Sequence, residues 1–218
     1  RCSVNRITSK SEANRQSGVH QVDEQRNHIL DAAEKLFLRN GIENTRMVDI
    51  AAETGITKVT LYRYFPNRDV IAVEIQVRML SRIMSLVDPA EPGSALESTR
   101  TLVQSMIRNF EALRDAYRYV GMFDKLFLDN PPDAALTRWT KEQLVALSWD
   151  NSHRIAVTQE DPQREPLLMV VSTVIWFLEK LALRGELTWS DQAVPLQRYL
   201  GHFEDMIVSY IDSLQPAD

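Results

Sequence analysis

The sequence has little of what builds covalent or metal-bound frameworks. Its 218 residues contain one cysteine, Cys2, so a disulfide framework and a thiolate metal cluster are both excluded. The four histidines, at positions 20, 28, 153 and 202, form no i,i+4 pair, and we expect neither a metal site nor a cofactor. A single thiol is typical of a reducing compartment, which favours a cytoplasmic location.

Long apolar runs and strand patterns are also missing. The first ten residues, RCSVNRITSK, lack the apolar stretch of a signal peptide. The longest apolar run, 167–178, is interrupted by Ser172 and Thr173, and it is shorter than the roughly 20 residues that span a bilayer. No segment alternates apolar and polar residues convincingly. We therefore expect no membrane partner, no sheet and an all-α fold.

Charge is distributed unevenly along the chain, although its net value is −5. Residues 1–68 hold 11 Lys and Arg against 8 Asp and Glu, a net charge of +3, whereas the remainder carries −8. A basic head on an acidic body is compatible with nucleic-acid binding by the head. Residues 1–21 are polar with little periodicity, which predicts a flexible arm that either lies in a minor groove or touches nothing.

Apolar residues recur at helical spacing through the rest of the chain, and glycine or proline separates many of the segments. Thr57 and Asn67 are residue types that cap helices, and we expect them to start the third and fourth helices. The expected helices, in order, are 22–40, 47–54, 57–64, 67–88, 94–115, 116–128, 133–154, 163–184 and 190–214.

Residues 47–64 have the spacing of a helix-turn-helix motif, in which Gly55 makes the tight turn between two short helices. The second helix of such a motif enters the major groove of DNA. Here the stretch TKVTLYRYF supplies basic and hydroxyl side chains for phosphates and base edges. The alternative is that its aromatic side chains close a small three-helix core, which is our expectation for Leu61 and Phe65.

These residues resemble the N-terminal DNA-binding domain of the tetracycline-repressor (TetR) family. The resemblance covers about residues 26–75 and rests on AAEKLF (32–37), NGIENT (40–45), DIAAETGIT (49–57) and TLYRYFPNRD (60–69). It implies an N-terminal three-helix DNA-binding domain, here 22–68, and a larger helical domain, here 69–218, for effector binding and dimerisation. The second domain shows no motif that matches.

The function that the resemblance implies is transcriptional regulation. The simplest form is a repressor, released from a palindromic operator in double-stranded DNA by a small hydrophobic or aromatic effector. Arg46 and Val59 depart from the residues usual in the family, so the operator sequence does not carry over. The DNA contacts implied position by position are Thr45, Arg46, Thr57, Lys58, Val59, Thr60, Tyr62, Arg63, Tyr64 and Arg68.

Ligand pockets in the family form among the middle helices of the second domain. His153, which follows Ser148, Asp150 and Asn151, is a candidate polar contact in such a pocket. For the aromatic and apolar candidates the alternative is ordinary core packing. Those candidates are Met106, Phe110, Tyr117, Phe123, Trp139, Leu144, Trp149, Trp176 and Phe177.

The last two helices carry more apolar surface than one core uses, which favours pairing with a second copy of the chain. The resemblance implies the same two helices as the homodimer interface. The expected interface residues are Val174, Leu178, Leu196, Tyr199, Phe203, Ile207 and Tyr210.

Two other functions remain open on the sequence alone. The first is a regulator or activator that binds DNA without responding to a ligand. The second is a helical enzyme or adaptor that carries the same head. The sequence has no GxSxG nucleophile elbow and no phosphate-binding loop, so we expect no enzyme.

Overall fold

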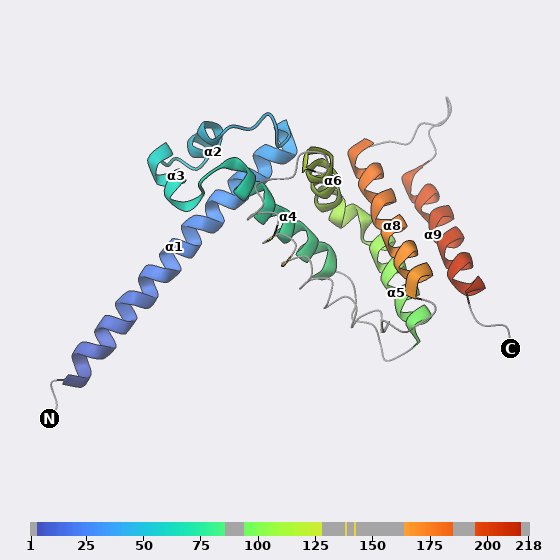
Figure 1. Ribbon diagram of the computed structural model, residues 1–218, viewed down its shortest axis with the longest axis horizontal. Coiled ribbons are helices and arrows are strands. Elements are labelled where there is room, and N and C mark those ends of the chain that lie inside the picture. Colours follow the sequence, from blue (N-terminus) through green and yellow to red (C-terminus); the bar gives the residue numbers. More distant parts are fainter. Residues whose placement is uncertain are drawn as a thin grey trace. The chain divides into compact units, whose positions relative to one another are not determined.

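The computed structural model describes residues 4–85, 94–127, 164–184 and 195–214, with the single positions 138 and 142; in residues 4–20 only the backbone is described. Within these ranges every regular element is a helix and none is a strand, which confirms the predicted all-α fold. The chain divides into two compact units, 1–75 and 76–218 (Figure 1). This division lies inside a helix rather than at the expected boundary between residues 68 and 69.

The first unit contains α1 (Val4–Asn40), α2 (Met47–Glu53), α3 (Lys58–Tyr64) and the first part of α4 (Arg68–Ser85). The helix α1 begins at Val4, where we expected an arm without regular structure. This corrects that expectation for the backbone of residues 4–20. No proline interrupts this stretch, so nothing in it stops the helix from continuing toward the N-terminus.

Two glycines make the turns of the first unit. Gly41 (φ 89°) follows α1 and Gly55 (φ 67°) joins α2 to α3, and both lie in the left-handed region that glycine adopts without steric cost. The turns bring apolar residues of the four helices together. The fully buried side chains include Ile29, Ala33, Phe37, Ile50, Leu61, Phe65 and Ile71.

One arginine connects three of the helices that form this core. The guanidinium of Arg26 on α1 forms an ion pair with Glu74 on α4. It also lies 4.5 Å from the centre of the Phe65 ring, close enough for a cation–π contact. Arg26 thereby ties α1 both to α4 and to the end of α3.

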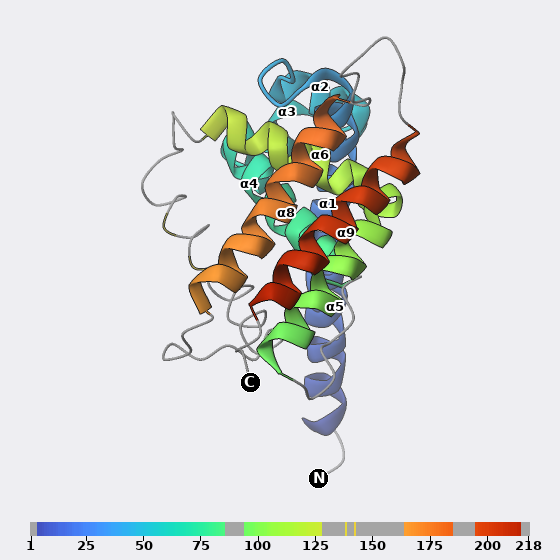
Figure 2. The same ribbon diagram turned by 90° about the vertical axis from the view of Figure 1, so that its right-hand side faces the viewer.

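The second unit contains the rest of α4, α5 (Ala95–Arg108), α6 (Phe110–Phe127), α8 (Arg164–Arg184) and α9 (Leu196–Ser213). The helix α8 packs against α5, α6 and α9, and Figure 2 shows it alongside α9. We expected one helix over 94–115, but the chain breaks at Asn109. The Asn109 side chain donates a hydrogen bond to the carbonyl of Ser105 (2.9 Å), which also accepts one from the Asn109 backbone N–H (3.0 Å).

The helices α6 and α8 approach each other closely at Gly121. A Cβ atom at this position would lie 2.8 Å from Cδ1 of Leu183 and 3.5 Å from Cβ of Glu179. The absence of a side chain at Gly121 therefore permits this packing.

The helix α8 is also long and apolar enough to cross a membrane by length and composition. Of its most apolar window, 39% is buried within the protein. A core helix of a soluble protein passes the same test, so this single helix is weak support for a membrane span. Its packing against three neighbouring helices agrees with our expectation of a core helix.

Candidate nucleic-acid interface and ligand site

The helix α3 has one buried and one exposed face. Leu61 and the following Phe65 are fully buried, as expected, and fix the helix to the core of the first unit. On the opposite face Val59 is 75% exposed and Tyr62 is 52% exposed. Lys58 and Arg63 are exposed beside them. Four of the predicted DNA contacts therefore share one solvent-facing surface, which we call the α3 face: Lys58, Val59, Tyr62 and Arg63.

The start of α3 is set by Thr57, which confirms the predicted cap. Its hydroxyl oxygen accepts a hydrogen bond from the backbone N–H of Thr60 (3.1 Å). The two threonine hydroxyls also lie 3.0 Å apart. Thr57 thus positions the α3 face, while Thr60 is half-buried at its side.

Arg46 caps α2 and is exposed at its N-terminus. Its guanidinium lies 3.0 Å from the Asp49 carboxylate, and hydrogen bonds from Arg46 lower the pKa of Asp49. Asp49 is therefore ionised near neutral pH. A DNA phosphate that binds this exposed arginine would replace the Asp49 carboxylate with another anionic partner.

Two predicted DNA contacts donate hydrogen bonds to backbone carbonyls of the first unit. Thr45 is fully buried, and its hydroxyl donates to the carbonyl of Gly41 at 2.8 Å. Arg68 is half-buried and donates to the carbonyl of Glu43 at 2.9 Å, so it holds the α1–α2 loop near the start of α4. Both side chains position the motif in this conformation, because their polar groups are engaged by backbone carbonyls. Tyr64 is half-buried.

The predicted pocket residues separate into different environments. Met106, Phe110, Tyr117 and Phe123 are buried, and the rings of Phe110 and Tyr117 stack with centroids 6.0 Å apart. Trp176 is 60% exposed. Phe177 is half-buried and stacks on Phe203 and Tyr199 between α8 and α9. The remaining candidates lie outside the described residues: Trp139, Leu144, Trp149 and His153.

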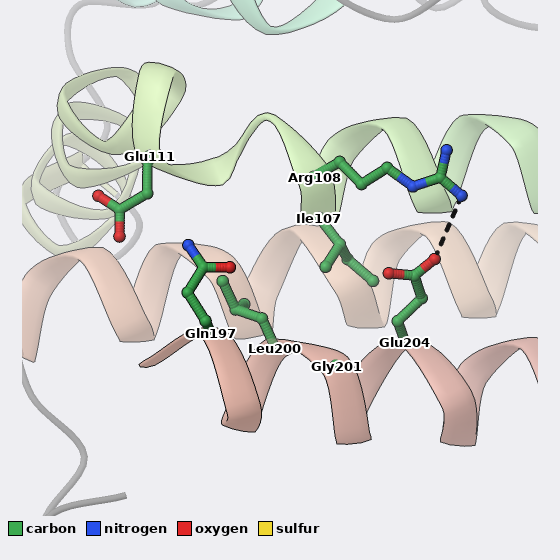
Figure 3. A pocket seen from close by; sticks show the side chains of 7 residues that line it. All are labelled: Ile107, Arg108, Glu111, Gln197, Leu200, Gly201 and Glu204. Atoms are coloured by element: carbon green, nitrogen blue, oxygen red, sulfur yellow. Dashed lines mark hydrogen bonds and ion pairs between the residues drawn. The ribbon is translucent and has the colours of Figure 1, made fainter. Parts of the chain in front are cut away.

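A small open pocket lies between α9 and the junction of α5 and α6 (Figure 3). Its volume of about 200 Å³ is below that of the ligand sites that enclose a drug-sized molecule. The Arg108 and Glu204 side chains, 3.4 Å apart, close one end. None of the predicted ligand contacts lines it. The lining residues are Ile107, Arg108, Glu111, Gln197, Leu200, Gly201 and Glu204.

The sequence reasoning missed one buried acid. Glu179 on α8 is only 5% exposed. Burial, with a smaller contribution from Asp124, raises the pKa of Glu179 to about 7, while Lys180 acts in the opposite direction. The signal was a glutamate that directly follows the apolar run 167–178. No group of three or more potential metal ligands occurs among the residues described.

The predicted dimer residues divide into buried and more exposed side chains. Val174, Leu178, Phe203 and Ile207 are buried within the chain itself, so they cannot lie at its surface. This corrects their assignment to the interface. Leu196 and Tyr199 are half-buried, and Tyr210 is exposed. The large apolar side chains exposed on α8 and α9 are Leu168, Met169, Trp176, Met206 and Tyr210.

Comparison with known proteins identifies the head. A sequence model of bacterial regulatory proteins of the tetR family matches residues 29–75, which contain the helix-turn-helix and the helices that support it. In this region the chain is similar to TetR-family regulators. The matched region includes α3, and the resemblance found in the sequence is confirmed.

Relatives and solved structures extend the TetR comparison. A helix-turn-helix-type transcriptional regulator of Mycobacterium tuberculosis H37Rv is 36% identical over 90 residues, 39% of this chain and 45% of that protein. The match thus spans about half of that relative. A second relative from the same strain is MftR, named as a mycofactocin biosynthesis transcriptional regulator. It is 25% identical over 201 residues, which are 86% of this chain and 91% of MftR.

The fold of the whole chain also matches solved TetR structures. A TetR regulator from Rhodococcus sp. RHA1 aligns with a TM-score of 0.58, at 14% identity, over 89% of this chain and 98% of that one. A TetR-like regulator from the same organism gives 0.57 at 18% identity, over 86% and 96%. At these identities the likeness establishes the fold alone.

Proposed function

We propose that this TetR-family chain is a cytoplasmic transcriptional repressor that binds a palindromic DNA operator as a homodimer and leaves it when a small hydrophobic ligand binds the second unit. The observation that carries the proposal is the α3 face. Val59 and Tyr62 project into solvent from a helix whose other side is packed. An apolar contact with DNA would cover surface that the isolated protein leaves exposed.

The chemistry of the α3 face suits the major groove. Lys58 and Arg63 are exposed cations for phosphate or for the acceptor edge of guanine. The Val59 methyl groups can contact the methyl group of thymine. The Tyr62 hydroxyl can donate to a phosphate oxygen. The cations support affinity for DNA, and the contacts to base edges support discrimination between bases.

Two copies are needed to read a palindrome. Met169 and Trp176 on α8 and Met206 on α9 are each more than half exposed, which is unusual for large apolar side chains. We assign them to the interface with a second copy, in place of the buried residues first expected. A two-fold dimer would present its recognition helices to successive major grooves, roughly 34–36 Å apart.

Ligand release requires two states with different DNA affinity. In one state the two α3 helices match the spacing of the operator grooves, and in the other they do not. A ligand that binds the second state more tightly lowers the affinity for the operator. The ratio of the ligand's affinities for the two states sets the size of this effect. The buried aromatic residues of α6 support an apolar site in the second unit, since Phe110 and Tyr117 stack there.

The proposal is tested by selecting binding sites from a random double-stranded DNA library at about 150 mM salt, where phosphate-only binding is weak. We expect enrichment of an inverted repeat. The Lys58→Ala/Arg63→Ala double variant, which removes both exposed cations of the α3 face, serves as the non-binding control. Equal enrichment by parent and double variant, or none by parent protein refolded free of bound small molecules, would show that the proposed function is wrong.

A further inference from the structure

Among the described residues, the second unit buries polar groups that have no hydrogen-bond partner. The Tyr117 hydroxyl on α6 is fully buried and has no hydrogen-bond partner among the described residues. On α5, the hydroxyls of Ser98 and Thr99 are buried and unpartnered in the same sense. A buried hydroxyl without a partner typically costs about 1–3 kcal/mol, so such groups point to a partner that binds from outside the chain.

Tyr117 and Glu179 belong to one region of the α6–α8 contact. Tyr117 lies one helical turn before Gly121, on the same side of α6. Gly121 packs beside Glu179, with 3.5 Å between its constructed Cβ position and Cβ of Glu179. The Glu179 carboxylate is near enough to contribute to the raised pKa of the Tyr117 phenol, whose main cause is burial.

The Glu179 carboxylate has no cationic partner among the described residues. No ion pair joins Glu179 to any basic group within the described ranges. Lys180 is the neighbouring base, but its ammonium lies 5.8 Å from the centre of the exposed Trp176 ring and forms a cation–π contact there. Asp124 on α6 adds a second negative charge near Glu179. The local field therefore favours a positive group and opposes a second anion.

The aromatic surroundings suit the same charge. Tyr117 presents its phenol oxygen as an acceptor, and it stacks with Phe110, which is buried. Carboxylate, phenol oxygen and aromatic ring faces all interact favourably with an ammonium group. By contrast, a ligand carboxylate would meet two acidic side chains and an acceptor.

From this arrangement we infer that the effector is a hydrophobic amine, and that its protonated nitrogen binds the Glu179 carboxylate beside the Tyr117 hydroxyl while its apolar part packs among the aromatic residues of α6. The inference rests on the proposed function, because it names the ligand class of the ligand-responsive unit. Glu179 is the charge-recognising residue and Tyr117 the second acceptor.

Three probes with one skeleton and different head groups test this inference on the full-length protein: 4-phenylbutylamine, 4-phenylbutanol and 4-phenylbutyrate. Isothermal titration at pH 7 is expected to show the amine binding at least tenfold more tightly than the alcohol, with the acid weakest. Binding of the amine should also release protons, because it ionises a carboxyl group that is partly protonated beforehand. Titrations in two buffers of different ionisation enthalpy measure that release.

Matched variants separate recognition from folding. Glu179→Gln is expected to remove both the preference for the amine and the proton release. Glu165→Gln, at an exposed position of the same helix, should keep both. Tyr117→Phe should weaken amine binding severalfold without changing proton release. Thermal unfolding of each variant checks that it is folded.

The inference is overturned if the alcohol or the acid binds as tightly as the amine, if no probe binds, or if Glu179→Gln retains the preference. Operator selection with the same preparation distinguishes this result from failure of the proposed function. Operator binding without amine preference removes the ligand assignment alone. Amine preference without operator binding removes the repressor assignment and leaves Glu179 as the recognition residue.

Discussion

Lys58 is the cation nearest the start of the α3 face, and its exposed ammonium has no ion-pair partner among the described residues. We expect Lys58→Ala to reduce operator affinity about tenfold and to lower the salt dependence of binding by about one counterion, because one phosphate contact is lost. Fluorescence anisotropy over a range of salt concentrations measures both quantities.

Lys35→Ala is the matched control, since Lys35 is an exposed lysine on α1 rather than α3. It should leave operator affinity and its salt dependence close to those of the parent. If the two variants behave alike, the α3 face does not contact DNA as we have placed it.

Thr57 stabilises the fold through its cap on α3. Thr57→Ala should lower the free energy of unfolding by about 1 kcal/mol, because the backbone N–H of Thr60 loses its acceptor. Thr57→Ser retains an acceptor oxygen and should lose much less. Urea unfolding of the three proteins measures the difference, and equal stability of the alanine and serine variants would argue against the cap.

Glu179 makes stability depend on pH. Its pKa is about 7 in the folded chain against an ordinary 4.5, so the folded state holds the proton more tightly than the unfolded state. The stabilisation from this proton is complete below about pH 4.5 and is lost as pH rises through 7. Glu179→Gln should therefore gain stability relative to the parent between pH 5 and about 8. Thermal melts across this range test the trend, and a constant difference would contradict it.

At single residues the sequence predicts local backbone chemistry better than solvent exposure. The Thr57 and Asn67 caps are confirmed, since the Asn67 side chain accepts from the N–H of Val70 at 2.9 Å. A cap depends on neighbours three residues away, which the sequence contains. The burial of Thr45 was missed, because its position depends on how the α1–α2 loop folds back to Gly41.

At the scale of elements, the packing of α6 on α8 makes two glycines behave differently. Gly121→Ala places a methyl group 2.8 Å from Leu183, whereas a methyl group on Gly201 in α9 meets nothing within 4 Å. Gly201→Ala should stabilise the protein by about 0.5–1 kcal/mol through helix propensity. Gly121→Ala should lose that gain or become destabilising by up to about 1–3 kcal/mol through overpacking.

Denaturant unfolding of the two glycine variants provides the comparison. If both variants gain the same stability, Leu183 rearranges without cost and α6 does not depend on Gly121. A destabilised Gly121→Ala variant with native helix content would instead identify this contact as the determinant of the α6–α8 distance.

Element boundaries were predictable where glycine, proline or a capping residue marks them. The predicted ranges for α2, α3 and α8 differ from the observed ones by about one residue. We expected the break between α5 and α6 between residues 115 and 116, whereas it lies at Asn109. Asn109 lies within a continuous helical pattern, so periodicity alone does not reveal the break.

For the whole molecule, the assignment of the interface to exposed residues of α8 and α9 predicts two different kinds of variant. Met169→Asp combined with Met206→Asp should convert the proposed dimer into a folded monomer, because charges replace apolar contacts at the surface. Phe203→Asp should unfold the second unit, since Phe203 is buried and its ring centroid lies 3.9 Å from that of Phe177.

Sedimentation velocity and far-ultraviolet circular dichroism distinguish these two outcomes. A double methionine variant that still sediments as a dimer would move the interface to another surface. The sequence predicted α8 and α9 as the interface, but several of the residues it named are buried within the chain. An apolar stripe does not reveal whether it packs inside its own chain or against a copy. Only the burial of each side chain separates the two cases.

The helix α4 begins in the first unit and ends in the second, and this bears on how the head could be transplanted between relatives. A chimaera joined at residue 68 would take Phe65 and Arg26 from one parent and Glu74 from the other. A junction after Ile75 keeps the Arg26–Glu74 pair and the Phe65 contact within one parental segment. The segment that can be exchanged between relatives therefore ends part-way along α4, and its boundary does not lie in a loop.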